Sequence, residues 1–249
     1  MKNIIIILIL FFGKQASAQV FIDKGVIEFE VKTNIKKTMG NSSWAEMMKD
    51  KLPQFKTAFY ELTFGDNKST YKLKSWENKS SIPEYLRKSD EENFWFMDYT
   101  NHKLSMVKNI FGTALNIEDS IPVIKWKLTN ESRIIAGFNC RKAVGVMMDS
   151  VYVFAFYTDE ITVSGGPCSL SGLPGMILGV TIPRMYSSWI ATKLNVNGVN
   201  EKEIKSISGK KTMPFATLKG IIMERLKDWG GSDEDSKAWM NQMIWSTFL

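Results

Sequence analysis

The segment SGGPCSLSGLPGMILGV, residues 164–180, contains five glycines, two prolines and one of the two cysteines of the 249-residue chain. No other window concentrates so many residues that restrict or release the backbone. Pro174 fixes φ at the second position of a turn, and Gly175 permits positive φ at the third. This pattern predicts a type II turn over Leu173 to Met176.

The turn is followed by an apolar run, Met176 to Ile182, which ends at Pro183 and predicts a buried strand. A rigid, glycine-lined loop therefore leads directly into a sheet. We expect any structural or binding role of the protein to lie in this loop. Its candidate residues are Gly165, Gly166, Pro167, Gly172, Leu173, Pro174, Gly175 and Met176.

The N-terminus has the parts of an export signal. A short basic start precedes nine uninterrupted apolar residues, Ile4 to Phe12, and the small-residue cleavage pattern Ala16-Ser17-Ala18. Nine apolar residues are too few to cross a bilayer, which takes roughly 20. Residues 1–18 are therefore a predicted signal peptide. We expect an exported, soluble protein in the periplasm, at the cell surface or outside the cell, without a transmembrane segment in its mature chain.

The mature chain, residues 19–249, shows no Pro/Gly/Ser-rich linker and no internal repeat, so we expect a single β-rich domain. Apolar residues make up 44% of the sequence, enough for a large core. The formal net charge of +6 is modest and its basic residues are scattered. We therefore expect no nucleic-acid partner.

Most of the mature chain has the patterns of β-strands and hairpins. Residues 25–33 alternate apolar and charged side chains, and residues 58–64 and 69–76 flank the turn sequence Gly65-Asp66-Asn67-Lys68. Similar segments recur as far as residues 201–207. Residues 151–157 are apolar on both faces, which predicts a strand that is covered on each side.

Helical patterns are fewer. A capping box of Ser43 and Glu46 predicts a short helix, and residues 77–93 are polar and predict a surface loop. Helical spacing of apolar residues over 215–229 predicts a longer helix, and a second begins at Ser232. The fold class is therefore α+β: a large, curved, open-barrel-like antiparallel sheet of about ten strands with two or three helices, two of them at the C-terminus.

Two cysteines remain in an oxidising compartment, which favours a disulfide between Cys140 and Cys168, with two unpaired buried thiols as the alternative. If Asp149-Ser150 forms a two-residue turn, Cys140 lies opposite Asp159, a short return away from Cys168. A bridge would then fix the glycine loop to the neighbouring hairpin.

The hexapeptide at residues 172–177, Gly-Leu-Pro-Gly-Met-Ile, resembles the signature of the GLPGLI family of exported Bacteroidetes proteins. The segments 137–143 and 156–161 resemble further elements of that family, as do Gly166-Pro167 and Ser69-Thr70-Tyr71. Met176 replaces the commoner leucine. Since the family has no established biochemical role, the resemblance implies an envelope location and no mechanism.

Residues suited to catalysis or metal binding are scarce. His102 is the only histidine and lies in a predicted hairpin turn, and no zinc, calcium or phosphate-binding pattern is present, so we expect no metal and no cofactor. Asp159 and Glu160 are adjacent, so on a strand their side chains point to opposite faces and cannot act together as a pair of catalytic carboxylates. We expect Glu160 to cap N–H groups of the glycine loop, with a solvated strand end as the alternative.

These observations favour a non-enzymatic binding or assembly module that acts with outer-membrane components. Its expected partner is an outer-membrane protein, a peptide or a lipid-like ligand. The alternatives are a hydrolase that uses Cys168 or Glu160, and a purely structural surface protein.

Overall fold

The computed structural model describes residues 21–39, 43–148, 150–207, 209, 211–227 and 234–249. The predicted signal peptide lies outside these residues and stays a prediction.

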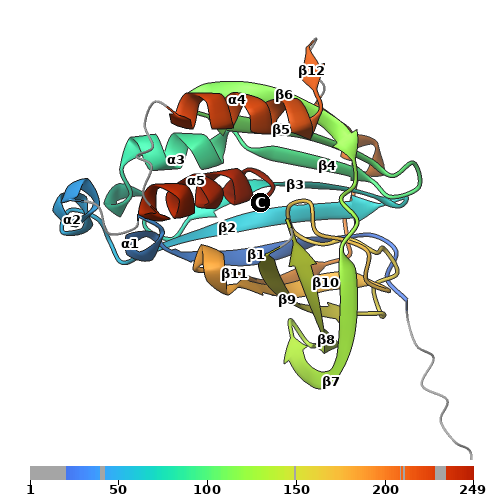
Figure 1. Cartoon of the computed structure of the whole chain (residues 1–249). Coiled ribbons are helices and arrows are strands. Elements are labelled where there is room, and N and C mark those ends of the chain that lie inside the picture. The colour runs from blue at the N-terminus through green and yellow to red at the C-terminus, as the bar shows by residue number, and fades with distance from the viewer. Residues whose placement is uncertain (1–20, 40–42, 149, 208, 210, 228–233) are drawn as a thin grey trace, which may run out of the picture.

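Twelve strands of the described chain form one sheet in the order β12-β6-β5-β4-β3-β2-β1-β11-β10-β9-β8-β7 (Figure 1). The predicted α+β class, with a large curved antiparallel sheet and two C-terminal helices, is confirmed. The strands are β1 (Gly25–Asn34), β2 (Phe55–Gly65), β3 (Lys68–Trp76), β4 (Phe94–Asp98), β5 (Lys103–Ile110), β6 (Thr113–Ser120), β7 (Lys125–Ile135), β8 (Phe138–Met147), β9 (Val151–Thr158), β10 (Met176–Ile182), β11 (Ser187–Asn195) and β12 (Thr212–Met213).

The sheet consists of two meanders joined edge to edge. Strands β1 to β6 pair in chain order, and so do β7 to β11. The two meanders meet where β11 pairs antiparallel with β1. Strand β12 alone pairs in parallel, with β6.

A short connection forces this sheet to curve. Strand β6 ends at Ser120 and β7 begins at Lys125, yet nine other strands lie between them in the sheet. Neighbouring strands are about 4.8 Å apart, so a flat sheet would hold β6 and β7 about 48 Å apart. A link of this length spans about 18 Å at most. The sheet must therefore bend into an open barrel, and Figure 1 shows the link running from β6 down to β7.

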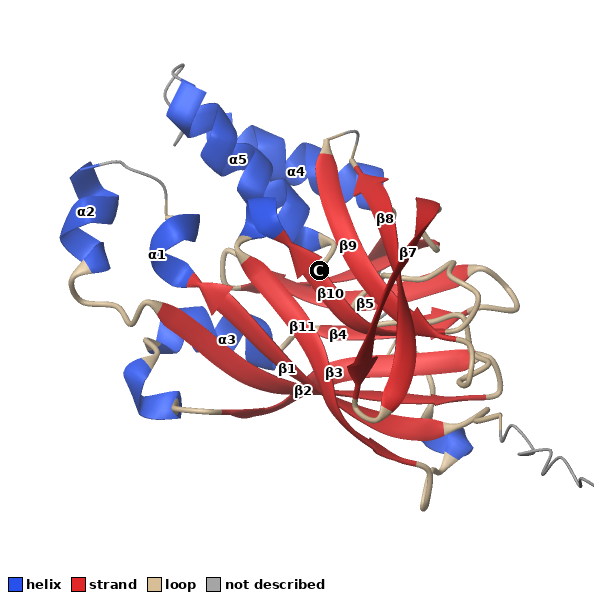
Figure 2. Ribbon diagram, turned by 90° about the horizontal axis from the view of Figure 1, so that it is seen from below, coloured by secondary structure: helices blue, strands red, loops and turns tan. Residues whose placement is uncertain are grey.

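The concave side of the curved sheet is filled by two helices and by the loop between β9 and β10. Leu218 and Ile222 of α4 (Phe215–Lys227) and Ile244 and Trp245 of α5 (Glu234–Thr247) belong to the same buried cluster as the sheet residues. Figure 2 shows both helices side by side over one end of the bent sheet. The other helical segments are α1 (Ile35–Thr38), α2 (Ser43–Lys49), α3 (Glu84–Glu91), η1 (Lys79–Ser81), η2 (Pro183–Met185) and η3 (Glu201–Glu203).

Several local predictions were wrong. The expected loop 77–93 contains η1 and α3, because Leu86 packs against a small separate cluster around Ile82 despite the polar composition. The expected strand 201–207 contains η3 instead, where the Asn200 side chain accepts a hydrogen bond from the Lys202 N–H. Strand β6 was missed because its hairpin turns at Phe111-Gly112, which lacks the usual Asn-Gly or Asp-Gly sequence.

The hairpin of β8 and β9 differs from the prediction by one residue. Arg141 pairs with Tyr157, whereas a two-residue turn would place it opposite Thr158. The main chain at Met148 has positive φ, and the Ser150 N–H donates to the Met147 carbonyl, so the connection is longer than predicted. A shift of one residue moves every side chain to the other face of a strand. Strand β9 is covered on both sides only in its second half, where Ala155 to Thr158 are all buried, whereas Tyr152 in its first half is 58% exposed.

The turn before β10 is tighter than a type II turn. The Gly175 N–H donates to the Leu173 carbonyl at 2.8 Å, which closes the turn over Pro174 alone. The predicted positive φ at Gly175 is confirmed, at +130°. A Cβ at this position would overlap the main-chain oxygen of Thr158. Glycine is therefore required both by the dihedral angle and by the close approach of two backbones.

We expect Gly175→Ala to lower the free energy of unfolding by about 3–5 kcal/mol, because it adds a backbone overlap to an unfavourable φ. Gly137→Ala is the matched control, since Gly137 has φ of +88° and open space around its Cβ position. It should lose about 1 kcal/mol. Urea denaturation of both variants measures the difference, and equal losses would show that the overlap is unimportant.

Candidate functional site

The predicted binding loop is mainly a core element. Of its eight candidate residues, only Gly172 and Pro174 are exposed. The other six, Gly165, Gly166, Pro167, Leu173, Gly175 and Met176, are buried. The loop therefore fills the concave side of the sheet and presents little surface to a partner.

Side chains from distant parts of the chain hold the loop in place. The Trp126 indole N–H donates to the Ser171 carbonyl at 2.9 Å, and the Ser169 hydroxyl donates to the Phe248 carbonyl at 2.8 Å. These bonds attach the loop to β7 on one side and to the C-terminal segment on the other.

The Tyr99 hydroxyl explains why the loop has glycine at position 165. It lies 2.7 Å from the Ser69 hydroxyl, and a Cβ at Gly165 would overlap it. Burial raises the pKa of Tyr99 to about 12. Hydrogen bonds from Ser69 and from the Gly166 amide favour the charged form and oppose this rise, but burial has the larger effect. The phenol therefore stays neutral and serves as a fixed hydrogen-bonding group beneath the loop.

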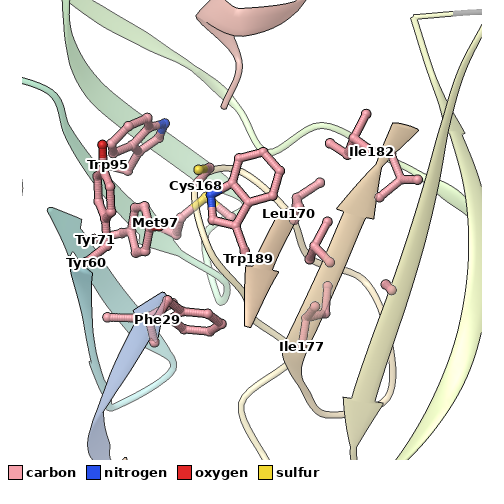
Figure 3. Close-up of a cluster of buried hydrophobic side chains, with 14 of the residues drawn as sticks. Phe29, Tyr60, Tyr71, Trp95, Met97, Cys168, Leu170, Ile177, Ile182 and Trp189 are labelled. Carbon is pink, nitrogen blue, oxygen red and sulfur yellow. The ribbon is translucent and has the colours of Figure 1, made fainter. Parts of the chain in front are cut away.

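Cys168, at the middle of the loop, faces an aromatic cluster. Its thiol lies near the Tyr71 hydroxyl and the Trp189 indole. Tyr71 stacks on Tyr60, with ring centroids 5.0 Å apart, and meets Trp95 edge-on at 5.4 Å. Figure 3 shows Cys168 beside Trp189, with Tyr71 and Trp95 on the facing strands.

The predicted disulfide is not formed, because Cys140 and Cys168 are both free, buried thiols. Trp189, beside Cys168, is paired with Val180, Val180 with Ala155, and Ala155 with Ala143. Paired residues of neighbouring strands point to the same face of a sheet, so Trp189 and Ala143 share the concave face. Cys140 is three residues from Ala143 on the same strand and therefore points to the opposite face. Its thiol donates to the Phe138 carbonyl at 3.6 Å.

Burial raises the pKa of Cys168 to about 12 and that of Cys140 to about 11. Thiolates, which are the nucleophilic form, are therefore disfavoured at both positions.

His102, the only histidine, is exposed in the turn between β4 and β5. Glu160 accepts a hydrogen bond from the Thr158 hydroxyl at 3.4 Å and from none of the described loop amides, so the expected cap is not formed. Among the described residues, no group of three or more acidic, His or Cys side chains could hold a metal ion.

Lys108 lies beside this cluster and is only 4% exposed. Its ammonium group donates to the main-chain oxygen of Leu249 at 2.9 Å and lies 4.4 Å from the centre of the Trp95 ring. Burial lowers the pKa of Lys108 to about 8. The carboxylate that opposes this shift, Asp90, already pairs with Lys56 at 2.6 Å.

A cavity of about 500 Å³ lies nearby, between the two C-terminal helices and the strands β5 and β6. Its wall includes apolar side chains of Leu104, Phe215, Ile244, Trp245 and Phe248, and polar groups of Asp119 and Lys219. Asp119 also accepts a hydrogen bond from the Phe215 N–H at 2.9 Å and so caps the start of α4. The cavity falls within the usual range of small-molecule sites, about 300–1,000 Å³.

Sequence reasoning missed Lys108 and the cavity. A signal for Lys108 existed, because Leu104, Met106 and Lys108 alternate along one face of β5 and only the last is charged. Ser69 and Tyr71 were noted only for their resemblance to a family segment, and both prove to contact the loop side of the core. The cavity had no local signal, since its wall joins residues 104 to 248.

The comparisons with known proteins give a family-model match over a short segment and a likeness of fold. A family model described as "Protein of unknown function (Porph_ging)" matches residues 146–179, which run from the end of β8 through the glycine loop into β10. None of the curated proteins compared with this sequence is a match. Among the helices that the structure describes, none has the length and apolar character needed to span a bilayer.

Two structures of PNGF-II, in space groups C2 and P21, resemble the fold with TM-scores of 0.51 and 0.52 at 15% and 14% identity. They cover 81% of this chain but only 33% and 34% of PNGF-II, so the chain spans about one third of that protein's length. At this identity the likeness shows the fold alone. An uncharacterized conserved protein from Thermus thermophilus is more distant, with a TM-score of 0.38 at 9% identity over 76% of this chain and 90% of that one.

The buried ammonium group predicts a specific pH dependence. Lys108 holds its proton up to about pH 8 in the folded chain and up to its ordinary pKa of 10.5 in the unfolded chain. Between these values the unfolded chain binds more protons, so the free energy of unfolding should rise with pH. Cys140, Cys168 and Tyr99 have raised pKa values and act in the opposite direction.

Lys108→Met separates these effects, because only the lysine differs between the two proteins. We expect the stability of the wild type minus that of Lys108→Met to rise by up to a few kcal/mol between pH 8 and 10.5, at about 1.4 kcal/mol per pKa unit. Urea denaturation at a series of pH values measures this difference. Parallel curves would mean that Lys108 is not desolvated in the folded chain.

Proposed function

We propose that this chain is an exported, GLPGLI-type protein of the cell envelope that binds an apolar, lipid-like molecule and acts with outer-membrane components. Export rests on the predicted signal peptide, residues 1–18. The envelope role rests on the resemblance of residues 172–177 to the GLPGLI signature, which lies within the segment that the family model of unknown function matches.

The observation that carries the binding proposal is the cavity of about 500 Å³ beneath α4 and α5. The apolar side chains of its wall suit a hydrocarbon ligand, because burial of apolar surface is the main favourable contribution to binding in such a site. The polar wall residues are Asp119, Ser120, Ser150, Lys219 and Asn241. Phe215 and Phe248, whose ring centroids are 3.4 Å apart, close one side of the cavity. Ala216, Lys219 and Asn241 of its wall are exposed, so a ligand can enter the cavity from solvent.

The hydrolase alternative is less well supported. Cys168 is buried with a raised pKa, and the Glu160 side chain is engaged with Thr158. The ammonium group of Lys108 favours the Cys168 thiolate, but burial outweighs it and raises the pKa of the thiol.

Binding of a peptide at the sheet edge is also less well supported. The exposed edge strand β7 carries Lys125 and Lys127 and has an irregular register between Leu128 and Ser132. Lysines and bulges on an edge strand are features that oppose pairing with another strand. The cavity is therefore the better candidate for ligand binding.

Binding of the uncharged fluorescent probe N-phenyl-1-naphthylamine to the purified mature protein tests the proposal. Ala216 lines the cavity, so Ala216→Trp should fill it and weaken probe binding by about tenfold or more, with little change in melting temperature. Thr217→Trp, at the next exposed position of α4, is the control and should bind as the wild type does. A wild type that does not bind the probe, or equal binding by both variants, would rule out this cavity as the site.

A further inference from the structure

The buried Lys108 and the apolar cavity are neighbours along one strand. Leu104 lines the cavity and lies on the same face of β5 as Lys108, four residues away. At about 3.3 Å per residue this separation is roughly 13 Å. Phe248 belongs to the cavity wall, and the next residue, Leu249, places its main-chain oxygen on Lys108. The C-terminal residues therefore connect the cation to the wall of the cavity.

One polar group beside Lys108 lacks an acceptor. The Trp95 indole N–H is buried and has no hydrogen-bond partner among the described residues. The buried Tyr71 hydroxyl has only the Cys168 thiol and the Trp189 indole near it. The Trp95 ring contacts the Lys108 ammonium, and Tyr71 contacts Trp95. Buried donors without acceptors are rare in folded proteins, so the Trp95 N–H is a group that a ligand oxygen would satisfy.

The partners of the Lys108 ammonium group suit an anionic oxygen ligand. It donates to an oxygen of Leu249 and lies over the Trp95 ring. Cys168 and Asp90 favour its charged form against burial, and Asp90 is already paired with Lys56. A singly charged ligand would match this one ammonium group, whereas a dianion would leave an uncompensated charge in the interior.

We propose that Lys108, with Trp95 and Tyr71, binds the head group of a singly charged amphiphile, such as a long-chain carboxylate, whose alkyl chain lies in the cavity. This proposal rests on the proposed function, since it assigns a head group to the same apolar ligand. The contact with Leu249 resembles the proposed one. An oxygen of this residue accepts a hydrogen bond from the Lys108 ammonium group, and the side chain of the same residue is apolar. The ligand takes the place of Phe248 and Leu249, which are only partly buried.

Competition with N-phenyl-1-naphthylamine tests the head-group site. The two competitors are laurate and dodecanol, which have the same alkyl chain and differ in charge, each used below its micellar concentration. We expect laurate to displace the probe from the wild type at a concentration about tenfold lower than dodecanol, as for a hydrogen bond to a charged group. Lys108→Met should lose this preference while its affinity for dodecanol is unchanged, and Lys108→Arg should keep the preference.

Lys219→Met is the matched control, because Lys219 also lines the cavity but is exposed. It should keep the preference for laurate, and thermal melting checks that each variant is folded. Equal displacement by laurate and dodecanol in the wild type would overturn the head-group site, and so would loss of the preference in Lys219→Met with its retention in Lys108→Met. Failure of the probe and of both competitors to bind would instead overturn the proposed function.

Discussion

The four-residue connection between β6 and β7 is the constraint on which the rest of the structure depends. It ties together two strands that stand near opposite ends of a twelve-stranded sheet. A sheet tethered in this way must curve, and a curved sheet has a concave side too deep for its own side chains to fill. The protein must therefore supply further elements to complete its core.

Two kinds of element fill the concavity, and they contribute differently. The loop between β9 and β10 brings its main chain deep into the interior, where hydrogen bonds from Trp126 and contacts with Tyr99 fix its position. Main chain can be buried only where its polar groups are satisfied, which explains the dense local hydrogen bonding of the loop. The C-terminal helices α4 and α5 instead cover the remaining opening with side chains, and their fit leaves a cavity. The core thus contains both the rigid loop between β9 and β10 and the less completely packed helices α4 and α5.

The interior also contains polar groups that do not improve stability. A buried ammonium group costs free energy unless it is well paired, and Lys108 has a weak set of partners for its depth. The Trp95 indole N–H, beside Lys108, has no hydrogen-bond partner among the described residues. The residues of the glycine loop are mostly buried, whereas the C-terminal segment borders both a cavity and the buried ammonium group. This difference is what points to ligand binding at the C-terminal segment, outside the loop in which a binding role was expected.

The sequence by itself determined the elements whose signals are local. Alternation predicted β1, the turn residues Gly65 to Lys68 predicted the β2–β3 hairpin, and helical spacing predicted α4. The sequence also identified Gly175 as a residue that needs positive φ. Each of these depends on dihedral preferences and periodicity over a few residues, which neighbouring residues fix.

Only the tertiary structure decided which side chains face the concavity. A one-residue difference in the β8–β9 register separates Cys140 from Cys168, and no local signal sets that register once the turn is misjudged. The pairing of β1 with β11 and the short β6–β7 connection bring together residues that are more than a hundred positions apart, including Lys108 and Leu249. Such contacts depend on the closure of the whole sheet. The sequence could therefore predict the class of fold and the rigidity of its central loop, but not the buried cation, its neighbour Trp95 or the cavity beside them.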